Sequence, residues 1–314
     1  MIHSFKIQPI YFHLSIIFIL AQGLFYRLSG PLIQPWDDIL NWYLALSGSF
    51  YALLWWLKKP SPFLLTLFGA LLSQMIPIYY FVTDSVIFNL ALSDITQTMI
   101  RYEKKLFSLF FPQGQISLWI ENHPTLGYST FFGKILTEVS QLFYFLFFLW
   151  GNLIFLLLSY RWMIQPNSRN TQNQWSLFFC LWTLAYSLNF ALYLVFPVYG
   201  PEIQYQTVYQ KPIEGLWLAS NLHQFIDSNH LSIHDCFPSG HTAISWIMAF
   251  CGYRLIGRNV GIFLGIAAFF TTLGTIYLRY HYIVDLLAAI PFTAMLLILF
   301  KVFQDLNSSE RRSS

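Results

Sequence analysis

The fold is decided by the stretch Asp285-Leu-Leu-Ala-Ala-Ile-Pro-Phe-Thr-Ala-Met-Leu-Leu-Ile-Leu-Phe-Lys301. Only uncharged and mainly apolar residues separate its two charged ends. A helix that crosses a membrane needs roughly 20 predominantly apolar residues, and the run with its flanks meets this requirement. Similar runs recur along the chain. The sequence predicts about eight spanning helices: 8–27, 39–57, 62–82, 136–159, 175–196, 241–256, 260–278 and 282–302. The predicted fold is an all-α polytopic membrane protein.

The composition agrees with this fold. Of the 314 residues, 56% are hydrophobic and only 10% are charged, whereas a soluble domain has roughly 25% charged residues. The net charge of +3 is too small to indicate a nucleic-acid partner. The three cysteines form no CxxC pair, so the sequence predicts neither a disulfide framework nor a thiolate metal site.

The distribution of charges predicts the orientation in the membrane. Eight crossings place both termini and the loops after the second, fourth and sixth helices on one side, which carries ten cations and two acids. Because short cytoplasmic loops are enriched in Lys and Arg, this side is expected to be cytoplasmic. The long connections 83–135 and 197–240 then face outward. The first helix is longer than the apolar core of a signal peptide and is expected to be retained.

Residues 93–111 form an amphipathic pattern within the first of these connections. Its apolar side chains recur at helical spacing: Ile95, Met99, Tyr102, Leu106 and Leu109. The pattern favours a helix that lies on the membrane surface. An ordinary amphipathic helix packed on the outer loops fits the pattern equally well.

Two polar segments interrupt the apolar chain, and both fall on the outward side. They are Asp235-Cys-Phe-Pro-Ser-Gly-His-Thr242 and Arg279-Tyr-His-Tyr-Ile-Val-Asp285. Ionisable groups at a membrane face are costly to bury, so their presence indicates a functional site.

The first segment is suited to holding an anion. Ser239 or Thr242 can cap the following helix. The free amides of its first turn, with no side chain on Gly240, can cradle a phosphoryl group. His241 then stands one turn from the bound group.

The second segment is suited to nucleophilic catalysis. His281 and Asp285 are four residues apart, which places them on one helical face. A carboxylate beside an imidazole fixes its tautomer and raises its basicity. Imidazole can itself attack phosphorus, and the fork of Arg279 can neutralise phosphoryl oxygens.

These segments resemble the type 2 phosphatidic acid phosphatase superfamily. Its second motif, Pro-Ser-Gly-His, is matched by Pro238–His241, and its third motif by His281 and Asp285. The form Arg-x-His-Tyr-x-x-Asp looks more like the branch of inositol phosphorylceramide and sphingomyelin synthases. The resemblance covers roughly residues 130–302.

The resemblance implies a division of the chain. Residues 61–302 would form a six-helix catalytic core, with 93–111 as an amphipathic insertion. Residues 1–60 would add two helices. Residues 303–314 are expected to be a disordered cytoplasmic tail, by composition.

The resemblance also implies a role for each site residue. His281 attacks the phosphoryl group and becomes phosphohistidine, while Asp285 orients it. His241 protonates the departing oxygen and then activates the acceptor. Ser239, Gly240 and Arg279 would hold the phosphoryl oxygens.

The sequence departs from the family pattern at two places. The first motif, a lysine followed by Arg-Pro, is missing, and the corresponding stretch Phe196–Pro201 leaves Lys211 as the nearest cation to bind phosphate. This stretch is most simply a rigid exit from the fifth predicted helix; alternatively, its Tyr199 can line a headgroup pocket. The usual arginine of the third motif is replaced by Thr275, so Arg279 is expected to take over its duty.

Three further histidines, His223, His230 and His234, lie in the outward loop. His230 and His234 have the spacing of a helical zinc clasp, but histidines in a polar loop more often face solvent or line a pocket mouth. We therefore expect no metal and no cofactor.

The sequence thus predicts a lipid-phosphate phosphatase or phosphotransferase, a phosphoric ester hydrolase or headgroup transferase in a cytoplasmic (plasma) membrane. Its partners would be the bilayer and a lipid phosphate or phospholipid substrate; the sequence does not define the oligomeric state. The alternative is a transporter or channel that uses the same polar cluster as an ion or proton path. That alternative predicts charges near the midpoints of several helices.

Overall fold

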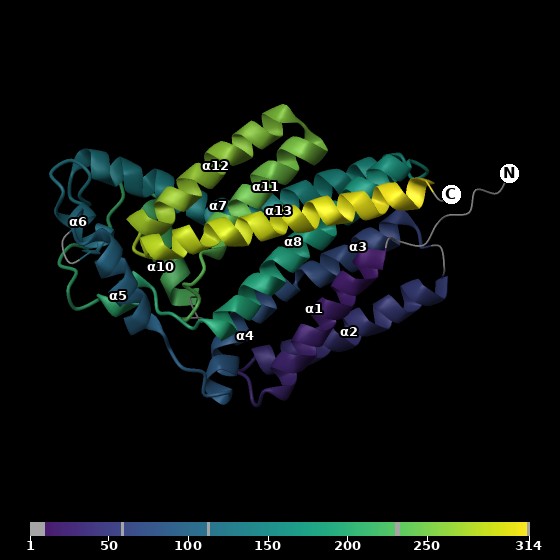
Figure 1. Ribbon diagram of the computed structural model, residues 1–314, viewed down its shortest axis with the longest axis horizontal. Coiled ribbons are helices and arrows are strands. Elements are labelled where there is room, and N and C mark those ends of the chain that lie inside the picture. The colour runs from purple at the N-terminus through teal and green to yellow at the C-terminus, as the bar shows by residue number, and fades with distance from the viewer. Residues whose placement is uncertain (1–9, 58–59, 112–113, 230–232, 313–314) are drawn as a thin grey trace. The chain divides into compact units, whose positions relative to one another are not determined.

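A computed structural model describes residues 10–57, 60–111, 114–229 and 233–312 (Figure 1). These residues are helical apart from their connections and one isolated parallel bridge between Val198 and Asp235. The all-α fold class predicted from the sequence is confirmed.

The chain divides into two compact units. Unit 1 comprises Met1–Leu90, Gly151–Phe190 and Met295–Ser314, and unit 2 comprises Ala91–Trp150 and Ala191–Ala294. The helices of unit 1 are α1 (Ile10–Leu28), α2 (Trp36–Leu57), α3 (Pro62–Ser73) and α4 (Met75–Asn89). Those of unit 2 are α5 (Thr96–Phe107), α6 (Ile116–Asn122), α9 (Pro201–Gln204), α10 (Ala219–Asn229), α11 (Gly240–Cys251), the π-helix η2 (Gly252–Ile256) and α12 (Arg258–Tyr277). Three long helices contribute to both units: α7 (Phe131–Ile164), α8 (Arg169–Val195) and α13 (Ile283–Arg312).

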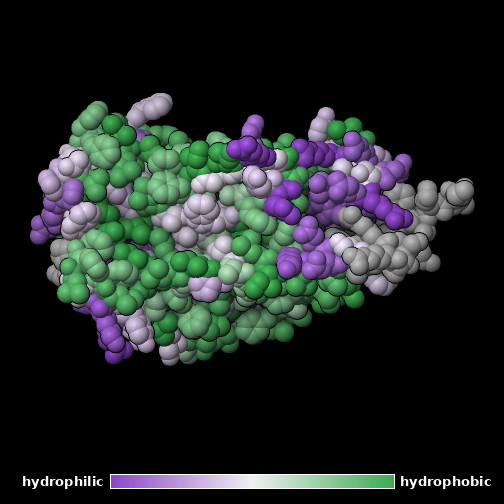
Figure 2. All heavy atoms as spheres, turned by 45° about the horizontal axis from the view of Figure 1, so that its top comes forward, coloured by the Kyte–Doolittle hydropathy of each residue, from purple (hydrophilic) through white to green (hydrophobic). Residues whose placement is uncertain are grey.

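Six helical segments in the described part of the chain are long and apolar enough to cross a membrane: Ile10–Leu28, Pro62–Asn89, Phe131–Ile164, Arg169–Val195, Arg258–Tyr277 and Ile283–Leu306. Hydrophobic side chains also cover most of the face shown in Figure 2. These features identify an integral membrane protein.

The predicted count of eight spanning helices is not confirmed. Helix α2 forms where predicted, but its Trp, Tyr and Ser residues and the acids of its first turn make it less apolar than the six segments. The sixth predicted helix also forms, as α11 continued by η2, and is short for a complete crossing.

Unit 1 is held together by aromatic side chains and a few buried hydrogen bonds. Trp175 and Phe179 stack with ring centroids 5.2 Å apart, and Gln22 donates to the carbonyl of Ser187 at 3.0 Å. Tyr11 near the start of α1 stacks on Phe303 near the end of α13, with centroids 4.6 Å apart. The beginning and the end of the chain's helical part therefore lie at the same end of unit 1.

In unit 2, a tight hairpin of α11, η2 and α12 brings two sequence-distant segments together. Gly257, with φ of 155°, makes the turn. A Cβ atom on Gly261 would lie 2.5 Å from the Cα of Tyr253, so glycine allows the close approach of the two helices. The hairpin returns the chain from α11 to the segment before α13, which carries the second polar motif.

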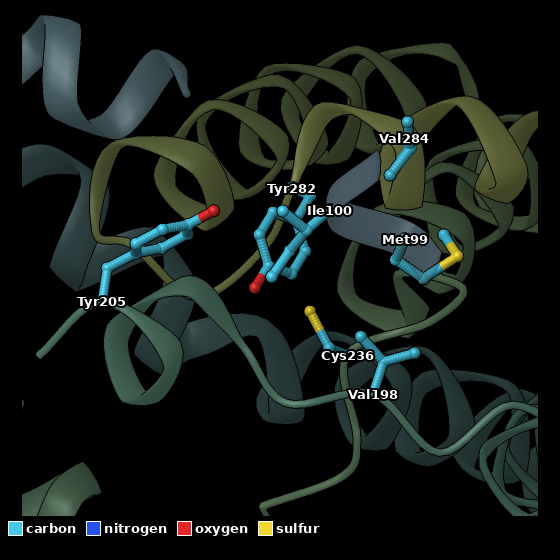
Figure 3. Packing of buried hydrophobic residues seen from close by; sticks show 7 residues of the cluster. All are labelled: Met99, Ile100, Val198, Tyr205, Cys236, Tyr282 and Val284. Carbon is cyan, nitrogen blue, oxygen red and sulfur yellow. The ribbon is translucent and has the colours of Figure 1, made fainter. Parts of the chain in front are cut away.

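One side of helix α5 packs inside unit 2. Its Met99 and Ile100 join a buried cluster with five residues from other segments: Val198, Tyr205, Cys236, Tyr282 and Val284 (Figure 3). The apolar side chains on its other side, including Tyr102 and Leu106, are exposed.

Helix α13 runs on to Arg312. It therefore continues through most of the segment that composition predicts to be disordered, because a charged run of this kind can remain helical as an extension of a packed helix.

Candidate active site

The Pro-Ser-Gly-His motif lies at the amino end of α11. The Oγ atom of Ser239 accepts a hydrogen bond from the Thr242 amide at 3.3 Å, and the Ser239 hydroxyl donates to Thr242 Oγ1 at 3.1 Å. The helix start predicted at Ser239 is confirmed. The amides of the first turn, including that of Gly240, lie where a helix leaves its N–H groups without intrahelical acceptors, which is a place suited to an anion.

His281 and Asp285 form a buried pair at the start of α13. The Nδ1 atom of His281 lies 3.4 Å from Asp285 Oδ2, and the two residues are 3% and 0% exposed. Asp285 Oδ2 also accepts the backbone amide of Tyr282 at 2.8 Å, which fixes the carboxylate. The carbonyl of Thr275, at the position where the family usually has arginine, accepts the His281 amide at 2.9 Å. With Nδ1 facing the carboxylate, Nε2 is the ring nitrogen left for chemistry.

The two histidines of the motifs lie side by side. The ring centroids of His241 and His281 are 5.9 Å apart, with an angle of 61° between the planes. The hairpin thus brings together two imidazoles that are 40 residues apart in the sequence.

Aromatic residues of α7 hold the His241 ring. Tyr144 stacks on it with centroids 4.3 Å apart and planes 20° apart, and the centroid of Phe147 lies 4.6 Å away. Aromatic rings therefore pack on His241, whereas His281 contacts a carboxylate.

A thiol adjoins the His281–Asp285 pair. The Sγ atom of Cys236 donates to Asp285 Oδ2 at 2.9 Å and lies 3.4 Å from His281 Nδ1. Burial and then the charge of Asp285 raise the pKa of the Cys236 thiol well above its usual range, so the thiol is protonated. In Figure 3 the sulfur points into the centre of the buried cluster.

Arg279 is held between two tyrosine rings. Its guanidinium carbon lies 3.8 Å from the ring centroid of Tyr209 and 4.5 Å from that of Tyr128. Burial raises the pKa of both phenols, so these rings are neutral. The residue has φ of 67°, a left-handed conformation that costs on the order of 1–3 kcal/mol and needs such support.

A buried carboxylate links Arg279 to Lys211. Nη2 of Arg279 lies 3.7 Å from Glu121 Oε1 and donates to the carbonyl of Lys211 at 2.8 Å. The ammonium of Lys211 in turn donates to the carbonyl of Glu121 at 3.1 Å. The structure therefore brings together Arg279 and Lys211, the two cations predicted to bind phosphate. Their partners are Glu121 and main-chain carbonyls. Nε of Arg279 has no hydrogen-bond partner among the described residues.

The stretch that replaces the first family motif packs on the turn that carries Arg279. A Cβ atom on Gly200 would lie 2.8 Å from the carbonyl oxygen of Tyr280, and the Glu202 amide donates to the Arg279 carbonyl at 2.8 Å. Glycine is required because the two main chains approach so closely. The segment therefore helps to hold the turn before His281.

The loop histidines have separate partners. His223 contacts the Tyr280 hydroxyl at 2.9 Å and Glu202 Oε1 at 3.4 Å. His234 is 3% exposed and packs on Tyr199, with centroids 4.1 Å apart, so it does not face solvent. His230 lies outside the described residues, and the hypothesis of a zinc clasp with it is not tested.

Glu103 of α5 binds the first turn of α13. Its two carboxylate oxygens accept the amides of Ile283 and Val284, each at 3.0 Å, and the residue is fully buried. Burial raises the pKa of Glu103 to about 7, the two amides oppose this shift, and the charge of Asp285 adds to it. This carboxylate fixes the helix turn that carries the catalytic candidates.

Sequence reasoning missed several residues of this site: Glu103, Glu121, Tyr128, Tyr144, Tyr209 and Cys236. A signal existed for Tyr144, because Tyr144, Phe147 and Phe148 have i, i+3, i+4 spacing and share a helix face. For Glu103 and Glu121, the signal was only that they are acids in the long connection 83–135.

The fold and the site together define the class of protein: an integral membrane protein with a paired-histidine site at the start of a helix. Residues 197–308 match the model of the PAP2 superfamily, a phosphatase-type family, and this match confirms the resemblance to type 2 phosphatidic acid phosphatases. The matched range contains both polar motifs.

A PA-phosphatase related-family protein of Dictyostelium discoideum is 28% identical over 241 residues, which cover 72% of this chain. The chain spans 44% of the length of that protein. No solved structure matches the chain significantly.

Proposed function

We propose that the protein is a lipid-phosphate phosphatase or phosphotransferase that works through a phosphohistidine on His281. The observation that carries the proposal is the pairing of His281 with Asp285 at 3.4 Å, with the His241 ring 5.9 Å away at the capped start of α11. The family match supports a substrate that is a lipid phosphate in a membrane.

In the first step, Nε2 of His281 attacks phosphorus and the bond to the leaving oxygen breaks. Asp285 stabilises the positive charge that develops on the imidazole. His241 gives a proton to the leaving oxygen. In the second step, His241 takes a proton from the acceptor hydroxyl, the new P–O bond forms and the P–N bond of phosphohistidine breaks.

The phosphoryl oxygens are held by donors around the motif. The amides at the start of α11 lie on one side, and the Ser239 hydroxyl joins them only if its proton turns away from Thr242 Oγ1. Nε of Arg279, which has no hydrogen-bond partner among the described residues, supplies a charged donor. Fixed donors of this kind are worth roughly 3–4 kcal/mol each in the transition state. Water as acceptor makes the reaction a hydrolysis, and a lipid or sugar hydroxyl makes it a transfer.

We place the site at the extracytoplasmic face, because eight crossings, together with the charge distribution of the loops, put both motifs there. The ion-path alternative has less support. Among the described residues, buried charged or histidine side chains lie in unit 2 with the exception of Asp84. A path across the membrane requires such groups along several helices.

The test is turnover by the purified chain in detergent, without added divalent metal, on a panel of lipid phosphates, with headgroup exchange measured in parallel. We expect His281→Ala to abolish turnover and His241→Ala to slow it strongly. His13→Ala is the matched control, because His13 pairs with Tyr51 in unit 1 and should keep full activity. Full activity in both site variants would refute the assignment.

A further inference from the structure

Three side chains of the types that can bind metal ions meet in the candidate active site. The proposed reaction uses only two of them. Cys236 precedes α11, His281 precedes α13 and Asp285 belongs to α13. Their exposed fractions are 1%, 3% and 0%. The spacing of the cysteines in the sequence gave no sign of this arrangement, because the hairpin of α11 and α12 creates it.

The distances between the three ligand atoms suit a single tetrahedral ion. Sγ of Cys236 lies 2.9 Å from Asp285 Oδ2 and 3.4 Å from His281 Nδ1, and Nδ1 lies 3.4 Å from Oδ2. Zinc bonds of about 2.0–2.3 Å at tetrahedral angles place ligand atoms about 3.3–3.6 Å apart. Two of the three separations fall in this range, and the third, from sulfur to oxygen, is about 0.6 Å shorter than the roughly 3.5 Å that zinc requires.

The charges and the ligand types favour a soft divalent cation. Thiolate, imidazole and carboxylate are the ligands that zinc takes in proteins, whereas Mg²⁺ prefers six oxygen ligands. Asp285 also has a second oxygen, Oδ1, without a hydrogen-bond partner among the described residues. A bound cation would offset the negative charge that Asp285 brings into this buried place.

We propose that Cys236, His281 and Asp285 form a binding site for Zn²⁺ or a similarly soft divalent cation, and that the bound ion inhibits the enzyme. On binding, the S–H bond of Cys236 is replaced by a bond from sulfur to the metal, and the proton leaves to solvent. The ion takes Nδ1 of His281, the proton of Nδ1 moves to Nε2, and the ion separates Nδ1 from Asp285. The imidazole then loses electron density to the cation and no longer attacks phosphorus.

The inhibitory part rests on the proposed function, and the binding part does not. Binding is therefore measured first and without substrate. The full chain in detergent competes for Zn²⁺ with a colorimetric chelator, and Cd²⁺ is titrated separately to follow its thiolate absorption band. We expect one bound ion per chain and no effect of excess Mg²⁺.

The decisive pair of variants is Cys236→Ala and Cys251→Ala. Both thiols are buried and free, but only Cys236 lies beside His281. We expect Cys236→Ala to weaken Zn²⁺ binding about tenfold or more, because a ligand is lost, and Cys251→Ala to bind like the parent chain. Zn²⁺ binding by Cys236→Ala as tight as by the parent would overturn the proposal.

A third variant covers the case in which Cys236→Ala does not fold. The double variant Cys180→Ala/Cys251→Ala retains Cys236 as its only thiol. It should still show the Cd²⁺–thiolate band, and a missing band would contradict the site. Inhibition, measured as the ratio of turnover with and without Zn²⁺, is then compared between the parent chain and the cysteine variants. If the chain binds Zn²⁺ through Cys236 but has no turnover on any lipid phosphate, the proposed function fails while the metal site stands.

Discussion

At the residue scale, the two histidines differ mainly in what surrounds them. His281 contacts a carboxylate and a thiol, while His241 lies among the rings of Tyr144, Phe147 and Phe148. Enzymes assign different tasks to identical side chains through such differences in environment. The polar partners of His281 fit a nucleophile that becomes positively charged, and the aromatic setting of His241 fits a group that exchanges a proton.

Asp285→Asn tests the orienting role of the carboxylate. The substitution keeps the shape but removes the charge that stabilises the imidazole, so kcat should fall about 10²–10⁴-fold with little change in KM. Steady-state turnover of a lipid phosphate measures both constants. A variant with unchanged kcat would show that Asp285 only fills space.

Substitutions of Tyr144 test whether its ring holds the His241 ring in position. Tyr144→Ala removes the stacked ring and should lower kcat roughly 10- to 100-fold, because His241 can then leave its position. Tyr144→Phe keeps the ring and should retain most of the activity. Equal losses in the two variants would mean that the hydroxyl, not the stacking, is the important feature.

At the element scale, the start of α13 is fixed from outside its own sequence neighbourhood. Glu103 reaches it from α5, 180 residues earlier in the chain. The carboxylate satisfies two amides that have no intrahelical acceptor, and this stabilises the turn next to His281.

Glu103 should give this protein an unusual dependence of stability on pH. Its pKa is raised by burial to about 7, above the 4.5 of the unfolded chain. The stability linked to this group is therefore fully present below about pH 4.5 and is lost as the pH rises through about 7. Glu103→Gln removes the ionisable group, but its amide nitrogen cannot accept one of the two backbone amides. Its Tm should therefore lie below that of the parent at pH 5, and the difference should shrink above pH 8 as the parent loses the stability linked to Glu103.

Thermal unfolding in detergent across this pH range measures the difference in Tm between Glu103→Gln and the parent. Glu214→Gln is the matched control, because Glu214 forms an exposed ion pair with Lys134 and should show no such trend. A difference in Tm between Glu103→Gln and the parent that stays constant from pH 5 to above pH 8 would contradict this linkage.

The sequence predicted the helices and the two motifs because both are local signals. Apolar runs mark long helices, and Pro238-Ser239 marks a helix start. The contacts of Cys236, Glu103 and Arg279 could not be predicted, because each joins segments that are far apart in the chain. The number of spanning helices was also uncertain at α2, where aromatic and hydroxyl side chains make the apolar signal weak.

At the scale of the whole molecule, the position of the termini does not depend on whether six or eight helices cross the membrane. Either even number returns the chain to the side on which it began. The stacking of Tyr11 on Phe303 within unit 1 agrees with this, because it joins the start of α1 to the end of α13.

Labelling with a membrane-impermeant maleimide tests the predicted orientation. The three native cysteines are buried, so the background should be low. Thr207→Cys and Asn167→Cys are a matched pair, since both positions are exposed and α8 lies between them. Thr207→Cys should react in intact cells and Asn167→Cys only after permeabilisation. The reverse pattern would place the active site on the cytoplasmic side.

The most direct measurement of the central claim is the trapping of the phosphorylated protein. Parent, His241→Ala and His281→Ala chains are incubated in detergent with phosphatidic acid labelled with ³²P in its phosphate, then denatured and counted. Our account predicts a protein-bound label that is stable to base and labile to acid, highest in His241→Ala and absent from His281→Ala. A label that persists in His281→Ala would contradict it.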